Sequence, residues 1–393
     1  GAVVDSDTPL YGGLDEIKLT NQTLKKAEAL AAKLWGADYA RFSTGGSTHA
    51  NQAIIFALGK PGDKVAVSRT THRSVLSALV LAGLEPIWMS PDIDAATGVP
   101  IGIGISELTR ALSEKPIAVL LTEPGYLGTI SDLPVLIEAA HKVDVPVILD
   151  AAWGGHFGFH PQLPRHAFQV GADALITSTH KALPGYSASA LLLARTNLLS
   201  AERLEQSFET THTTSPAGAP LASIDGVRAL LETRGEELIG NLLSNIHRFK
   251  EIVQVEFALP IFLYPTDFPD GRFDPSKIVL RVQQLGASGV EIEKDLQEKD
   301  IRVEMADRDT IVFLATIADT KADFDHLADV LIPILKKRQE QRRESATALS
   351  WSVVPQRAAS MREAYFAETE MVLAANAVGR ISADLIAPYP PGV

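Results

Sequence analysis

The sequence predicts an α/β protein with two domains, a large domain built on a mostly parallel β-sheet and a smaller α+β domain after it. Three observations support this prediction. Short apolar runs alternate with amphipathic helical segments in the first part of the chain. Each run is apolar on both faces, which is typical of a parallel sheet covered by helices. After about residue 240 this pattern changes, so we divide the 393 residues into a large domain, 1–245, and a small domain, 246–393.

The helices and strands of the large domain are predicted from the spacing of apolar residues and from glycines that end helices. Residues 22–35 have helical spacing and end at Gly36, and residues 72–83 form a similar segment that closes at Gly83. Further helices are expected over 106–115 and 132–143, and a helix follows the glycines at 45 and 46. The expected strands are residues 63–68, 85–90, 117–124, 145–153 and 172–180.

The small domain is expected to follow a long helix over residues 236–254. Residues 277–337 then predict the order strand, helix, strand, strand, helix. The polar and charged stretch 338–350 is expected to be a linker or a solvated helix end.

Composition limits the class of partner. The formal net charge is −12 and no basic run is present, which argues against binding to a nucleic-acid backbone and favours a small-molecule partner. The chain has no cysteine, which excludes disulfides and metal sites built on thiolates, and its histidines show no metal-ligand spacing. No apolar run approaches the roughly 20 residues of a membrane span, and no signal-peptide pattern begins the sequence. We therefore expect a cytoplasmic protein.

A glycine turn stands directly before a predicted helix. Gly45, Gly46, Ser47 and Thr48 combine close backbone approach, unpaired helical N–H groups and two hydroxyls, an arrangement that suits a phosphate. The same residues are also consistent with an ordinary N-cap, because they form neither a Walker A sequence nor a GxGxxG motif.

Two charged residues follow neighbouring predicted strands. Asp150 closes the apolar run 145–149 at the start of the strand expected over 145–153, and Lys181 follows the strand over 172–180. The carboxyl ends of parallel strands form the edge where α/β sheets bind ligands. The apolar and hydroxylic flanks of Lys181 suit an amine that must lose its proton and act as a nucleophile. Taken singly, Asp150 could instead cap a turn, Lys181 could be solvated, and His72 could be a helix cap.

The order of these features resembles a known constellation. A glycine turn, a histidine, a strand-end aspartate and then "STHK" follow one another as in the fold-type-I pyridoxal 5'-phosphate enzymes. More specifically, the chain resembles the Orn/Lys/Arg decarboxylases, bacterial basic amino-acid decarboxylases with the aspartate-aminotransferase fold. The motifs that support this are "TPLYGGLDEI", "FSTGGSTHANQAII", "KPGDKVAVSRTTHRSV", "LDAAWGGHFGF", "ADALITSTHKALPG", "TTSPAGAPLASIDGVRAL" and "AVGRISADLIAPYPPG".

The resemblance implies roles for individual residues. Lys181 would form the internal aldimine with the cofactor, Asp150 would pair with the pyridinium nitrogen, and His72 would stack on the ring. Ala152 would be the small residue on the opposite face of the ring. The other residues implied to bind the cofactor are Ser47, Thr48, Ser178, His180, Thr214 and Ser215.

The resemblance also implies an assembly and a reaction. Residues 213–216, "TTSP", would reach toward the phosphate of a neighbouring subunit, which implies a homodimer or an assembly of dimers. The expected reaction is decarboxylation of arginine, lysine or ornithine. One alternative is an aminotransferase, in which Arg281 or Arg302 would have to hold the substrate carboxylate, or a lyase acting on another amino acid. A second alternative is a non-catalytic homologue, which has no physical need for a nucleophilic lysine opposite a buried carboxylate.

Overall fold

A computed structural model describes residues 22–95, 97–269, 271–339 and 356–382. The first quoted motif, most of the predicted linker at 338–350 and the end of the last motif lie outside these residues. Within the described part of the chain, no helix is long and apolar enough to cross a membrane.

A seven-stranded sheet forms the centre of the large domain, with the spatial order β1-β7-β6-β5-β4-β2-β3. Its strands are β1 (Tyr39–Ser43), β2 (Lys64–Ser68), β3 (Glu85–Met89), β4 (Val119–Thr122), β5 (Val147–Asp150), β6 (Ala174–Ser178) and β7 (Ala190–Ala194). β3, β2, β4, β5 and β6 pair in parallel, whereas β7 pairs antiparallel with both β6 and β1. The sheet is therefore mostly parallel, as the sequence predicts.

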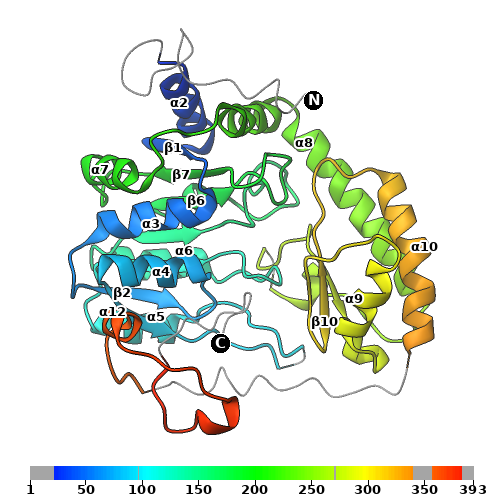
Figure 1. Cartoon of the computed structure of the whole chain (residues 1–393). Coiled ribbons are helices and arrows are strands. Elements are labelled where there is room, and N and C mark those ends of the chain that lie inside the picture. The colour runs from blue at the N-terminus through cyan, green and yellow to red at the C-terminus, as the bar shows by residue number, and fades with distance from the viewer. Residues whose placement is uncertain (1–21, 96, 270, 340–355, 383–393) are drawn as a thin grey trace.

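Helices cover both faces of this sheet (Figure 1). Those of the large domain are α2 (Thr23–Trp35), α3 (Gly46–Leu58), α4 (Arg73–Ala82), α5 (Ile105–Ser113), α6 (Leu133–His141) and α7 (Ala201–Thr211). Successive residues of β4 show the two layers, because Leu120 packs with the residues of α3, α4 and α7, while Leu121 packs on the opposite side with α5 and α6. The strands are thus buried on both faces.

The small domain lies beside the large sheet (Figure 1). It contains a three-stranded antiparallel sheet in the order β8-β10-β9. Its elements are β8 (Ile278–Arg281), α9 (Gly289–Gln297), β9 (Met305–Ala306), β10 (Thr310–Phe313) and α10 (Lys321–Arg338). Their order agrees with the predicted one. Short 3-10 helices occupy Ala167–Gln169, Pro265–Asp267, Val282–Leu285 and Ala374–Asn376, and α12 spans Met361–Phe366.

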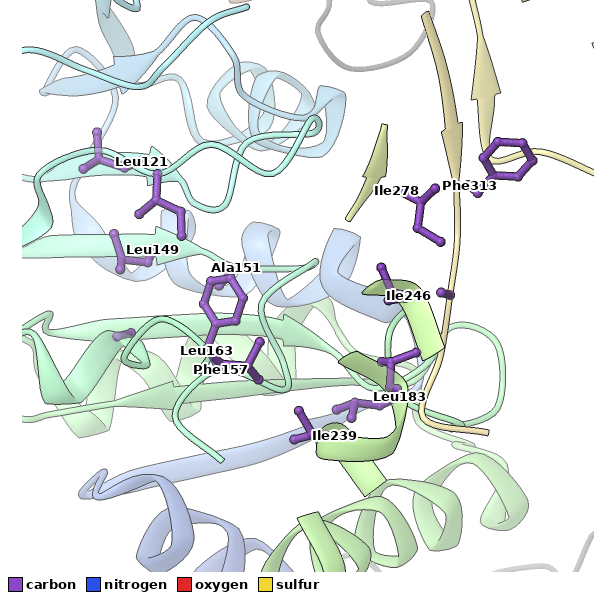
Figure 2. Close-up of a cluster of buried hydrophobic side chains, with 14 of the residues drawn as sticks. Leu121, Leu149, Ala151, Phe157, Leu163, Leu183, Ile239, Ile246, Ile278 and Phe313 are labelled. Atoms are coloured by element: carbon purple, nitrogen blue, oxygen red, sulfur yellow. The ribbon is translucent and has the colours of Figure 1, made fainter. Parts of the chain in front are cut away.

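The long helix α8 (Gly218–Gln254) joins the two domains. Its Ile239 and Ile246 belong to one buried cluster that also holds Leu183 of the large domain and Ile278 of the small domain (Figure 2). The core is therefore continuous between the two domains. The boundary that we propose after residue 245 falls within α8.

Several elements differ from the sequence-based expectation, among them α7 and α12, which were not predicted as helices. α8 begins at Gly218 rather than at residue 236. Pro220 does not break this helix, because it lies in the first turn, where a proline needs no N–H partner. β1 and β7 were not predicted as strands. β1 is an edge strand in which buried and half-buried residues alternate only in part. Its Arg41 pairs with acidic side chains of α2 and α7, including Glu28. Such side-chain pairing is not visible in the local pattern.

Candidate active site

A cavity of about 310 Å³ opens at the carboxyl ends of the central parallel strands. β5 ends at Asp150, and Lys181 follows the end of the adjacent parallel strand β6. Thr122, the last residue of the other neighbouring strand, also lines the cavity. The sequence-predicted residues that line it are Ser47, Thr48, His72, Asp150, Ala152, Ser178, His180 and Lys181.

Hydrogen bonds orient the Asp150 carboxylate, which is buried. Its Oδ2 accepts from Asn51 Nδ2 at 2.8 Å, and its Oδ1 accepts from the backbone N–H of Ala152 at 3.2 Å. Asn51 Nδ2 also donates to Ser74 Oγ at 3.0 Å. Both carboxylate oxygens therefore have a donor within the protein, and the carboxylate is kept in one orientation inside the cavity.

His72 is held as a neutral ring. It is the N-cap of α4, and its Nδ1 accepts from the backbone N–H of Ser74 at 3.2 Å, which leaves the proton of the neutral imidazole on Nε2. Burial lowers the pKa of His72, and the nearby Lys181 lowers it further, whereas Asp150 opposes the shift. A flat, uncharged ring therefore lines the cavity at neutral pH.

Lys181 lies in an environment that disfavours its charged form. Burial lowers the pKa of its amine below the usual value, although Asp150 and Glu304 oppose the shift. The Nζ atom lies 4.3 Å from the centre of the Trp153 ring. The preceding residue, His180, is fixed by a 2.8 Å hydrogen bond from its Nδ1 to the carbonyl oxygen of Ser189. Lys181 is half-buried, and a lysine with a lowered pKa is a better nucleophile than a fully exposed one.

Hydroxyl groups also converge on the cavity. Ser47 Oγ lies 2.8 Å from Ser178 Oγ, and Thr48 and the start of α3 lie beside them. Gly45 is required there, because a Cβ at this position would come within 2.7 Å of His49 Cβ. A phosphorylated pyridine aldehyde needs hydroxyls at a helix N-terminus for its phosphate, a buried carboxylate for its ring nitrogen and a lysine for its aldehyde. The site therefore fits pyridoxal 5'-phosphate.

His49 packs against the glycine turn and makes the stability of the folded chain depend on pH. Its Nδ1 lies 2.8 Å from Ser43 Oγ and its Nε2 3.0 Å from Thr211 Oγ1. Burial, assisted by His212, lowers the pKa of His49 from 6.5 to about 4. Between these values the unfolded chain binds a proton that the folded chain does not bind, so the free energy of unfolding falls as the pH drops from 6.5 to 4.

We expect His49→Gln to remove about 1 to 3 kcal/mol of this pH dependence. Urea unfolding of the wild type and of the variant at several pH values between 6.5 and 4 measures the effect. His247→Gln is the matched control, since the His247 side chain is 70% exposed. Equal pH dependence in the wild type and in His49→Gln would contradict the prediction.

Thr214 and Ser215 are the two predicted residues that the structure does not bring to the cavity. Both are exposed in the segment before α8, where the N–H of Ser215 donates to Thr213 Oγ1 at 3.2 Å. Conversely, Asn51 lines the cavity although the sequence reasoning did not select it. Its position one helical turn after Ser47 was the available signal, because residues i and i+4 share a helix face.

The structure resembles solved enzymes over most of its length. Lysine decarboxylase A from Pseudomonas aeruginosa matches with a TM-score of 0.82 and 21% identity, over 99% of this chain and 66% of that chain. Serine palmitoyltransferase from S. paucimobilis, in a structure with bound pyridoxal phosphate and myriocin, matches with a TM-score of 0.64 and 14% identity, over 82% of this chain and 78% of that chain. The fold is thus that of the fold-type-I pyridoxal-phosphate enzymes.

Sequence comparison identifies the family within this class. Residues 4–265 match the family model described as Orn/Lys/Arg decarboxylase, major domain. Arginine decarboxylase of Bacillus subtilis (strain 168) is 34% identical over 389 residues, which are 97% of this chain and 79% of the relative. The chain therefore belongs to the Orn/Lys/Arg decarboxylase family, as its motifs predicted.

Proposed function

We propose that this protein is a pyridoxal 5'-phosphate-dependent decarboxylase of a basic amino acid. The observation that supports it best is the placement of Lys181 and Asp150 at the carboxyl ends of two adjacent parallel strands, where they line one cavity with the paired hydroxyls of Ser47 and Ser178. When bound, the cofactor supplies an aldehyde for an amine and a ring that accepts electrons from a breaking bond.

Each residue has a defined part in this proposal. The Lys181 amine would bond the cofactor and later deliver a proton to the carbon that lost its carboxylate. Asp150, held by Asn51, would keep a proton on the ring nitrogen. His72 and Ala152 would lie against the two faces of the ring, and His180, beside Ser178, would support the phosphate end.

The proposed substrates are arginine, lysine and ornithine. Relatives of the chain are named arginine decarboxylase and lysine decarboxylase, which supports a basic amino acid. The half-buried Glu304, which accepts a hydrogen bond from Tyr126 Oη at 3.0 Å, adds negative charge beside the cavity wall. Because such a charge attracts a cationic side chain, it is consistent with this substrate class.

Product analysis tests the proposal. The purified chain is incubated with pyridoxal phosphate and with arginine, lysine or ornithine, and mass spectrometry detects agmatine, cadaverine or putrescine together with released CO₂. We expect one of these amines to form in amounts equal to the CO₂. A protein that shows the visible band of bound cofactor but forms no amine would contradict decarboxylation.

No observation favours the aminotransferase alternative. Arg281 lies on β8 and Arg302 donates to the carbonyl oxygen of Gln297 at 3.1 Å. Neither is among the described residues that line the cavity. Formation of a keto acid instead of an amine in the product assay would revive that alternative.

We further propose a homodimer in which each active site is completed by the neighbouring subunit. The proposal is supported by the exposure of Thr214 and Ser215, which line no part of the cavity of their own chain. Light scattering is expected to give twice the mass of one chain. Ser215→Ala is expected to weaken cofactor binding about tenfold, the loss of one hydrogen bond to a charged group. The proposal would be contradicted if the chain were a monomer in solution and if Ser215→Ala bound the cofactor as tightly as the wild type.

The expected products place the reaction in a metabolic context. Agmatine, cadaverine and putrescine are polyamines or their precursors, so we propose a cytoplasmic role in polyamine biosynthesis. Cell fractionation with an antibody to the chain tests the location, and a disrupted gene that leaves cellular amine levels unchanged would contradict the role.

A further inference from the structure

His212 lies between the end of α7 and the glycine turn of the candidate active site. It is the C-cap residue of α7, where its backbone N–H donates to the carbonyl oxygen of Phe208 at 2.9 Å. Its ring contacts Thr44, which is 168 residues away in the sequence and directly precedes Gly45 and Gly46. His212 is half-buried and is not among the described residues that line the cavity. Any effect of His212 on the cavity therefore passes through the turn, residues 44–46.

The His212 ring accepts hydrogen bonds from the first residue of the turn. Thr44 Oγ1 lies 3.3 Å from His212 Nε2, and the backbone N–H of Thr44 donates to the same nitrogen at 3.5 Å. A ring nitrogen that accepts an N–H carries no proton, so the proton of the neutral imidazole is on Nδ1. Both donors of Thr44 are thus directed at one acceptor.

The other N–H groups of the turn are bonded to different elements. The N–H of Gly45 donates to Ser43 Oγ at 3.2 Å, and the N–H of Gly46 donates to the carbonyl oxygen of Ala188, which lines the cavity, at 2.6 Å. The turn is therefore held at each of its three residues. His212 provides the acceptor at the first of them.

The turn determines where the first residues of α3 lie. Ser47 and Thr48 follow it in the first turn of this helix, where N–H groups have no partner within the helix. Ser47 Oγ also lies 2.8 Å from Ser178 Oγ at the cavity. An anion bound here would contact groups whose positions depend on the turn.

Aromatic contacts fix the plane of the His212 ring. Its centre lies 4.8 Å from that of the His49 ring and 4.9 Å from that of the Phe208 ring. Phe208 is completely buried, and the guanidinium carbon of Arg41 lies 4.4 Å from its ring centre. Because closely packed rings have few other rotamers available, His212 Nε2 stays directed at Thr44.

The charge state of His212 agrees with its role as an acceptor. Burial lowers the pKa of His212, and Arg41 lowers it further, while Glu209 and the backbone of Thr213 oppose the shift. The ring is therefore neutral at neutral pH, and a protonated ring would have no acceptor nitrogen. His49, which packs on this ring, is also neutral, because its pKa is lowered to about 4.

We propose that His212 is a positioning residue for the phosphate of the cofactor: by holding Thr44 it fixes the glycine turn, and so strengthens the binding of the phosphate but not of the pyridine ring. This role rests on the proposed function, in which the turn binds the phosphate. Lys181 and Asp150, which would hold the aldehyde and the ring nitrogen, lie on other elements, after β6 and at the end of β5. Their part of the binding should not depend on His212.

Two aldehydes separate phosphate binding from ring binding. The full chain, freed of cofactor, is titrated with pyridoxal phosphate and with pyridoxal, and the visible band of the bound aldehyde gives each Kd. In His212→Leu we expect pyridoxal phosphate to bind about tenfold more weakly and pyridoxal to bind as it does to the wild type. In His212→Gln, whose amide oxygen can accept from Thr44, the affinity for pyridoxal phosphate should stay within about threefold of the wild type.

Thr44→Val separates the effect of the turn from that of the segment after His212. This variant keeps the shape of Thr44 and removes its hydroxyl, while His212 and the following residues are unchanged. We expect it to bind pyridoxal phosphate about fivefold more weakly, with no change for pyridoxal. His247→Leu is the control, because the His247 side chain is 70% exposed, and it should bind both aldehydes as the wild type does.

The role of His212 is overturned if His212→Leu binds pyridoxal phosphate as tightly as the wild type. It is also overturned if His212→Leu loses affinity for both aldehydes by the same factor, or if His212→Gln loses as much as His212→Leu. If His212→Leu does not fold, an unchanged ratio of the two affinities in Thr44→Val overturns it. A wild-type chain that shows no visible band with either aldehyde would instead contradict the proposed function.

Discussion

Lys181→Ala is expected to abolish amine formation, lowering kcat by roughly a thousandfold or more. The reason is that, in the proposed function, Lys181 provides the amine that bonds the cofactor, and it is a half-buried lysine with a lowered pKa that lines the cavity. Steady-state assays of amine and CO₂ measure the loss. The hydroxyls of Ser47 and Ser178 remain in the variant, so the cofactor should still bind without a covalent link.

Reduction with borohydride separates the covalent from the non-covalent state. In the wild type, reduction should fix the cofactor to the peptide that contains Lys181, and Lys181→Ala should retain no such label. Lys142→Met, which removes an exposed lysine, serves as the control and should behave as the wild type. A variant that keeps kcat within tenfold of the wild type, or a label found on a different lysine, would show that Lys181 is not the nucleophile.

Asp150→Asn should lower kcat by roughly a hundredfold to ten-thousandfold and change KM much less. In the proposed function, the buried Asp150 carboxylate holds a proton on the ring nitrogen, and a neutral amide cannot stabilise that positive charge. The effect concerns the chemical step rather than substrate binding. Single-turnover assays of CO₂ release measure it.

Asn51→Ala distinguishes the charge of Asp150 from its orientation. This variant keeps the carboxylate and removes the 2.8 Å hydrogen bond to its Oδ2, so we expect a loss of only about tenfold. Asp150→Asn with an unchanged kcat would contradict the role of the carboxylate. Equal losses in the two variants would assign the effect to orientation rather than to charge.

The large domain could be predicted to a considerable extent because its signals are local. Strands β2 to β6 are apolar runs between amphipathic helices, and a parallel sheet covered on both faces requires that pattern. The antiparallel edge of the sheet was not predicted. β1 and β7 pair across more than a hundred residues, as the partners Tyr39 and Ala194 show, and no local periodicity reports such a pairing.

The shared position of Asp150 and Lys181 at one edge of the sheet was predicted from local signals as well. Asp150 and Lys181 stand at the carboxyl ends of strands that are adjacent and parallel, so their convergence follows from the topology rule for such sheets. The conformation of His72 was not predicted, because a helix N-cap and a ring that lines a cavity look the same in sequence. In the structure His72 is both.

Local pattern and motif order alone established the α/β class, the strand ends that bear Asp150 and Lys181, and the resemblance to a decarboxylase family. The position of Lys277 could only come from the tertiary structure. A lysine before a strand is ordinarily solvated, and nothing near it in the sequence indicates otherwise. It is buried beside Trp153 because α8 and a continuous core hold the small domain against the large one. Burial and charge coupling arise from such long-range packing, which a local pattern does not encode.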